Sequence, residues 1–327
     1  MRQNHIMAVL LAVLCLAAAV LGISLIRTYR NVNWIPESAV EDLCRVLAAD
    51  GIELDPAMVP RQRENGTIYM SDGAGYEENA ALLLAGSDIK SSYMIPDGQL
   101  FLHYNGDITE FTEGFQFRYR KNGGVQRDPG QPDTSGIVSG GEVQDFAALT
   151  EAMSPLSPAG NAALAAAAFL NRQDEILADG VKVETVIAAA YGTEEGLAYV
   201  QCRRQIDGVE ITDHGVICRV EAGVVTEAAG KWCFMTFGES YVTQLSDITN
   251  ILFMMKRTFG TESTDAGEDG TPPTVCTVTG LERCYSLYFF SGDEGFCLIP
   301  CWRVETDRGD VLVYSGLDGT LYTKISD

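Results

Sequence analysis

Apolar residues recur along this chain with two different periods, which predicts a mixture of helices and strands. A spacing of three to four residues predicts helices over Glu37–Ala49, Glu77–Ala85, Ala159–Ala178 and Leu245–Phe259. In the last of these segments, Leu245, Ile248 and Leu252 have the spacing of one buried helix face. Alternation of apolar and polar residues predicts strands near 67–70, 91–104, 108–120, 181–191, 197–206, 214–235, 282–290, 297–306, 309–315 and 320–325.

Turn residues separate several of these strands. Pro96-Asp97-Gly98 and Ala222-Gly223 each lie between two apolar runs and predict hairpins. Residues 121–141 are rich in Gly, Pro and Asp, which predicts a linker or a long loop. The sequence therefore predicts a first α+β domain over residues 27–120 and a second over 142–327.

The N-terminal segment carries a long uncharged run. Residues 6–26 contain no charged side chain over 21 positions. As a helix this run is roughly 31 Å long, close to the thickness of a bilayer core. It predicts a transmembrane helix in contact with membrane lipid, after a cytoplasmic stub of residues 1–5, and a single-pass protein of the cell membrane with an extracytoplasmic C-terminal part. A cleaved signal peptide, with Ala17 and Ala19 at its cleavage site, is the alternative.

The charge of the chain narrows the class of partner. It has 45 Asp and Glu against 23 Lys and Arg, a formal net charge of −22. Such a chain repels nucleic acid and anionic lipid headgroups. Solubility is the simplest explanation of the acidity, and a basic protein partner is the alternative.

The cysteines are the first candidates for chemistry. Cys297 and Cys301 lie in the stretch CLIPCWRVETDRG. In a strand they would be about 13 Å apart, whereas the Cα atoms of a disulfide lie within about 7 Å. Cross-strand disulfides between Cys202 and Cys218, and between Cys284 and Cys301, are possible pairings. Free buried thiols are an equal alternative.

No other motif predicts catalysis. His103 and His214 have no Cys-x-x-Cys or second histidine at zinc-ligand spacing, and the chain has no Gly-x-Ser-x-Gly nucleophile motif. The sequence therefore predicts a non-enzymatic protein, with no catalytic, cofactor-binding or metal-binding residue, no cofactor and no small-molecule substrate.

A short repeat suggests how the second domain is organised. The string Arg-Val-Glu occurs at 219–221 and at 303–305, each time after a helix and a strand and before a Gly-containing turn. This order predicts two tandem units in which a helix covers one face of an antiparallel sheet.

The chain resembles the YycI/YycH family of membrane-anchored regulators of Gram-positive bacteria, whose sheets are similar to PepSY modules. The resemblance rests on the single N-terminal span, on LAADGIEL, on YVQCRRQIDGVEITDHGVICRVEAGVV and on IPCWRVETDRGDVLVYSGLDGTL. It implies a non-enzymatic regulator that contacts a sensor histidine kinase of cell-wall homeostasis, or a paralogous regulator, through transmembrane and extracytoplasmic surfaces. A PepSY-type module that binds or inhibits a peptidase or a cell-wall enzyme is the alternative.

Overall fold

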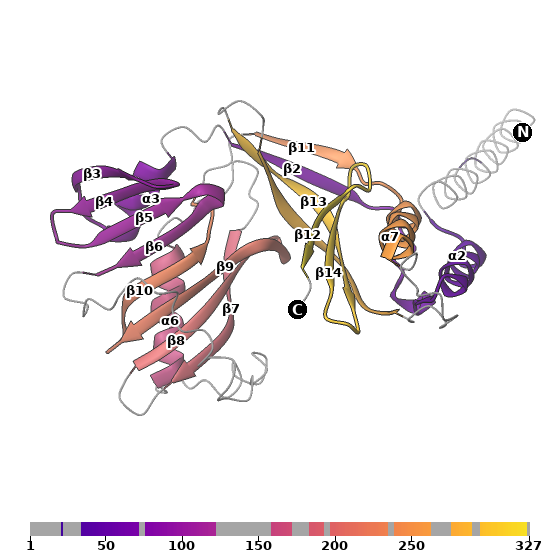
Figure 1. Ribbon diagram of the computed structural model, residues 1–327, viewed down its shortest axis with the longest axis horizontal. Helices are drawn as coiled ribbons and strands as arrows, with labels where there is room; N and C mark the ends of the chain where they lie inside the picture. The colour runs from indigo at the N-terminus through magenta and orange to yellow at the C-terminus, as the bar shows by residue number, and fades with distance from the viewer. Residues whose placement is uncertain are drawn as a thin grey trace, which may run out of the picture. The chain divides into compact units, whose positions relative to one another are not determined.

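The protein is described by a computed structural model, shown in Figure 1. The structure describes Leu21 and residues 34–71, 76–121, 158–171, 183–192, 197–234, 239–262, 276–289 and 295–325. Its main helices are α2 (Glu37–Ala49), α3 (Tyr76–Ala85), α6 (Pro158–Leu170) and α7 (Ile248–Glu262).

The strands account for most of the remaining described residues. They are β1 (Ile52–Glu53), β2 (Asn65–Ser71), β3 (Ile89–Ile95), β4 (Gly98–His103), β5 (Ile108–Thr112), β6 (Gln116–Arg120), β7 (Val183–Gly192), β8 (Leu197–Ile206), β9 (Val209–Glu221), β10 (Val224–Lys231), β11 (Glu239–Gln244), β12 (Cys276–Phe289), β13 (Phe296–Thr306), β14 (Val311–Ser315) and β15 (Leu321–Ile325).

These fifteen described strands form one hydrogen-bonded sheet of mixed direction. Its main path is β11-β2-β13-β12-β9-β10-β6-β5-β4-β3, with β14 and β15 branching from β13 and β7 and β8 from β9. Both β1 and β9 pair with β12 in parallel. The predicted fold class, an N-terminal transmembrane helix followed by separate helix-covered antiparallel sheets in tandem, is therefore wrong, because strands that are distant in sequence pair into one mixed sheet.

The sheet branches at β13 because this strand changes partners along its length. The first residues of β13, Phe296 to Leu298, pair with β2, whereas Cys301 to Glu305 pair with β14. Pro300, which has no N–H to donate, lies between these two pairings. Sequence alternation identifies such a strand but does not reveal its second partner.

The prediction of a membrane span needs correction. Within the described ranges, no helix is both long and apolar enough to cross a bilayer. The longest of the four main helices, α7, has 15 residues and is therefore about 22 Å long, shorter than a bilayer core of about 30 Å. Neither the transmembrane helix nor the single-pass membrane localisation is retained. The predicted span itself, residues 6–26, falls outside the described residues except for Leu21.

The described residues divide into two compact units, each assembled from separated stretches of chain. Unit 1 comprises residues 1–66, 242–282 and 301–327, and unit 2 comprises residues 67–241 and 283–300. The predicted linker, residues 121–141, lies outside the described residues except for Lys121.

In unit 2, two helices each precede a run of four antiparallel strands. Helix α3 leads into β3 to β6, and α6 leads into β7 to β10 (Figure 1). Helix α6 packs across β7 to β10, and β8 alternates strictly between buried and half-buried residues. The buried positions join a core that includes Phe117, Tyr119, Phe169, Val200 and Val216.

In unit 1, helices α2 and α7 share a core with parts of β12, β13 and β14. The apolar spacing of α2 predicts a stripe of Val40, Leu43, Val46 and Leu47, of which Val46 is 39% exposed and the other three are buried. An ion pair of 2.7 Å joins Lys256 Nζ of α7 to Asp50 Oδ2 at the end of α2.

The bounds of α2 are confirmed, whereas α7 begins three residues later than predicted. The Asp247 carboxylate accepts a hydrogen bond of 3.2 Å from the Thr249 N–H and therefore caps the helix at Ile248. The last predicted turns of the helix over Ala159–Ala178 lie outside the described residues from position 172 onward.

The Arg-Val-Glu repeat does not mark equivalent positions. Its first copy ends β9, the third strand after α6, and its second copy lies in β13, the second strand after α7. The predicted tandem of two units is therefore corrected. Three identical residues with strand-like alternation fit many strands and do not specify one place in a sheet.

The hairpin between β9 and β10 is confirmed and offers a stabilising substitution. Ala222 and Gly223 both have positive φ, at 49° and 76°. Two positive φ angles define a type I′ turn, in which asparagine is strongly preferred and alanine is strained. We expect Ala222→Asn to raise the free energy of unfolding by about 0.5–1 kcal/mol in urea titrations. A lower value than wild type would contradict this assignment of the turn.

Candidate functional site

The stretch CLIPCWRVETDRG lies in β13 and the turn that follows it. Cys297 and Cys301 are both buried, and they pair with Met70 and Ser315 of different strands. Burial raises the pKa of the Cys297 thiol to about 11. A protonated buried thiol is a poor nucleophile, so this stretch contributes packing to the sheet.

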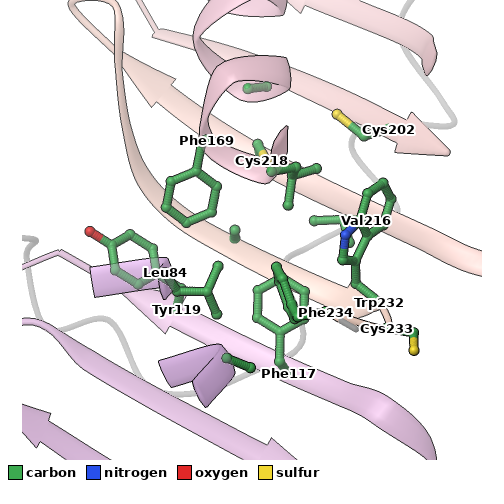
Figure 2. Packing of buried hydrophobic residues seen from close by; sticks show 14 of the residues in the cluster. Leu84, Phe117, Tyr119, Phe169, Cys202, Val216, Cys218, Trp232, Cys233 and Phe234 are labelled. Atoms are coloured by element: carbon green, nitrogen blue, oxygen red, sulfur yellow. The ribbon is translucent and has the colours of Figure 1, made fainter. Parts of the chain in front are cut away.

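None of the eight described cysteines is in a disulfide. Cys202 and Cys218 lie diagonally across β8 and β9, because Cys202 is opposite Val216 in the register (Figure 2). A hydrogen bond with Cys202, together with burial, raises the pKa of the Cys218 thiol. The predicted proximity of these two residues is thus present, but as two thiols, and the predicted disulfide between Cys284 and Cys301 is not formed either.

A cluster of buried polar side chains in unit 2 surrounds residues 232–234, and these three residues are called the strap below. The strap follows β10 and has no regular secondary structure, yet Trp232, Cys233 and Phe234 are all buried. Figure 2 shows Trp232 and Phe234 within the apolar core, and Phe234 packs edge-on against Phe117 with ring centroids 5.1 Å apart.

Side chains provide most of the hydrogen-bond partners of the strap backbone. Tyr76 Oη donates to the Trp232 carbonyl at 2.7 Å and accepts from the Phe234 N–H at 3.4 Å. The Cys233 N–H donates to His214 Nε2 at 2.8 Å, and the Arg204 guanidinium donates to the Cys233 carbonyl. The Trp232 N–H donates to the Phe115 carbonyl at 3.0 Å, and these three side chains are the partners of further backbone groups of the strap, because buried backbone groups need partners.

Helix α3 and two sheet irregularities bring these residues together. Helix α3 contributes Tyr76, while Arg204 and His214 lie where the pairing of β8 with β9 is interrupted, between Arg203 and Gln205. Just before His214, β9 turns to β12, where Ile211 pairs with Tyr285. Bulges of this kind redirect side chains and often occur beside functional sites.

The electrostatics of the group are dominated by one buried cation. The Arg204 guanidinium lies 5.7 Å from the centroid of the Trp232 ring, and the His214 ring lies edge-on to the same indole at 5.9 Å. Burial, Arg204 and Lys231 together hold the pKa of His214 well below its usual range. Burial likewise raises the pKa values of Tyr76 and Cys233. The group therefore holds a neutral histidine at neutral pH.

The second described histidine also has a structural role. His103 Nδ1 donates to the Ser87 carbonyl at 3.0 Å, and its Nε2 accepts from Thr109 Oγ1 at 3.0 Å. Nearby, the buried Asp107 carboxylate accepts hydrogen bonds from Tyr119 Oη and Asn105 Nδ2, both at 2.9 Å. This network closes the turn between β4 and β5.

Several described strands lie at an edge of the sheet with one partner strand, among them β3, β7, β11 and β15. Among the described strands, β3 hydrogen-bonds only to β4. Its side chains Tyr93 and Met94 are 54% and 81% exposed. Across the described ranges, no three His, Cys, Asp or Glu side chains are grouped as a metal site requires.

A comparison with solved structures finds a distant structural likeness. No family model matches the chain, and no curated protein matches it. A crystal structure of an uncharacterized protein from Eubacterium rectale ATCC 33656 is similar over 84% of this chain and 91% of its own, with a TM-score of 0.43 and 10% identity. The resemblance to the YycI/YycH family stays an untested prediction.

Proposed function

We propose that the chain is a non-enzymatic binding protein that receives an extended segment of a basic partner protein along the outer edge of β3. The observation that carries the proposal is the pairing of β3 with β4 alone among the described strands, together with the exposed Tyr93 and Met94. An exposed strand edge is a template for a further strand, and exposed side chains beside it give specificity.

The charge of the chain supports a basic occupant. The net charge is −22, and the exposed Asp88 and Asp97 lie at the two ends of β3. Opposite charge on a partner steers its approach and disfavours acidic competitors. The exposed Lys90 within β3 would oppose an indiscriminate strand addition.

The chemistry-bearing residues support binding over catalysis. His103 and His214 both hold hydrogen bonds of the fold, and the Cys202, Cys218 and Cys233 thiols are buried. Groups engaged in this way stabilise the scaffold that presents β3.

Labelled peptides provide the test. We expect the octapeptide (Val-Lys)4 to bind at least tenfold more tightly than (Val-Glu)4 in fluorescence anisotropy titrations, and a version with two central prolines to lose binding because proline removes backbone donors. Met94→Ser, which removes the exposed apolar side chain without changing the charge, should weaken binding of (Val-Lys)4 severalfold, whereas Tyr104→Ser, at an exposed position outside β3, should not. Equal binding of all three peptides, or an unaffected Met94→Ser variant, would sink the proposal.

A further inference from the structure

His214 is held in one protonation state by the backbone of the strap. Its Nε2 accepts a hydrogen bond from the Cys233 N–H at 2.8 Å, so the ring proton must reside on Nδ1. A second proton could be added only at Nε2. The ring would then direct an N–H at the Cys233 N–H, and both this hydrogen bond and the support of the strap at Cys233 would be lost.

The surroundings of His214 also disfavour a positive charge. Arg204 faces it from β8 and Lys231 faces it from the end of β10, and both are cations. The remaining titratable groups of the cluster, the Tyr76 hydroxyl from α3 and the Cys233 thiol, are neutral at pH 7 because burial raises the pKa of each. His214 itself is buried, and its Nδ1 has no hydrogen-bond partner within the described structure.

We propose that His214 is an acid-sensitive latch, in which uptake of one proton at Nε2 breaks the hydrogen bond to Cys233 and releases the strap from its position in the core. The closed strap excludes the proton, whereas an open strap exposes the imidazole to water. Acid therefore favours the open strap, and the apolar side chains of Trp232 and Phe234 become accessible only then.

The direction of the pH dependence follows from linkage. The histidine pKa is depressed in the closed state and is about 6.5 in the open state, so the open state binds more protons below that value. Above about pH 6.5 neither state takes up the proton and the opening equilibrium is constant. Below it, the opening constant rises about tenfold for each pH unit until the pKa of the closed state is reached.

Amide hydrogen exchange of the full chain measures this equilibrium directly. After correction for the intrinsic exchange rate, we expect protection of the Cys233 amide to fall about tenfold from pH 5.5 to pH 4.5. The Lys121 amide, which donates to the Thr226 carbonyl in the same unit, should keep constant protection. Constant protection at Cys233, or an equal loss at both amides, would overturn the latch, since the second outcome reports global unfolding.

Two matched variants separate the latch from the other buried histidine. His214→Gln places an amide oxygen near the position of Nε2 and cannot titrate, so protection at Cys233 should become independent of pH. His103→Gln changes a buried histidine whose ring nitrogens both have partners, and it should leave the tenfold slope intact. If protection of the Cys233 amide still falls with pH in His214→Gln, or no longer falls in His103→Gln, a group other than His214 is titrating and the proposal is refuted. If His214→Gln does not fold, the wild-type comparison of Cys233 with Lys121 still decides.

Discussion

Replacing Gly230 by alanine is expected to lower the free energy of unfolding by about 3–5 kcal/mol. Gly230 has a φ of +149°, and a Cβ atom there would lie 2.0 Å from the Gly215 carbonyl oxygen and 2.8 Å from the Val216 Cα. These are backbone atoms of the paired strand β9, so no side-chain rotation can relieve the overlap. Strain in a glycine-only region costs about 1–3 kcal/mol, and overpacking adds about 1–3 kcal/mol.

Two other glycines of unit 2 separate these contributions. Gly208 also has positive φ, at +77°, but an added Cβ would meet nothing within 4 Å, so Gly208→Ala should cost only the strain of about 1 kcal/mol. Gly215→Ala has neither a clash nor a positive φ and should stay within about 1 kcal/mol of wild type. Midpoints of urea unfolding provide the comparison. A Gly230→Ala midpoint equal to that of Gly208→Ala would contradict the close approach of β9 and β10.

Local signals in the sequence predict the local elements of this fold well. Apolar spacing from Val40 to Leu47, between Pro36 and Gly51, predicts α2 at its observed bounds, although Val46 in that spacing is exposed. Gly223 marks the turn between β9 and β10, because glycine adopts a positive φ without strain, whereas Ala222 is strained there. In each case the information lies within a few neighbouring residues, where periodicity and turn chemistry act.

The long-range pairing could not be predicted in the same way. Alternation in β13 shows that Cys297 and Cys301 are in a strand, but not that Cys297 pairs with β2 and Cys301 with β14. The parallel contact of Ile211 with Tyr285 joins residues far apart in sequence, with no local signal. Strand partners depend on which apolar faces meet after the chain collapses. The sequence therefore indicates the antiparallel pairing within each hairpin, but the prediction that the hairpins form separate sheets is wrong.

One residue of the candidate site, Arg204, can be recognised in the sequence because it interrupts an apolar pattern. In β8, the buried face is formed by Ala198, Val200 and Cys202, and the next position on that face is Arg204. A cation at a buried position requires a specific partner, so this break in the alternation indicates a polar group in the core. The sequence places His214 at the start of a predicted strand but does not reveal its burial, because the irregular pairing that buries it is visible only in the register of β8 and β9.

The strap also predicts the largest effect of a single side-chain deletion. Trp232 is 2% exposed, and its indole contacts both the Arg204 guanidinium and the His214 ring. Trp232→Ala should therefore lower the free energy of unfolding by about 3–5 kcal/mol, the usual cost of deleting a buried tryptophan. The loss has two sources: a cavity forms in the core, and the Arg204 cation loses the aromatic face that lies beneath it.

Two further tryptophan variants distinguish the strap from a general effect of aromatic loss. Trp34 is 51% exposed, so Trp34→Ala should change the free energy of unfolding by no more than about 0.5 kcal/mol. Trp232→Phe keeps an aromatic face under Arg204 and removes part of the volume, so its midpoint in urea should fall between wild type and Trp232→Ala. Similar midpoints for Trp232→Ala and Trp34→Ala would mean that the strap is not part of the cooperative core. In that case the polar side chains around it would not stabilise unit 2, because their hydrogen bonds all converge on a segment whose packing contributes nothing.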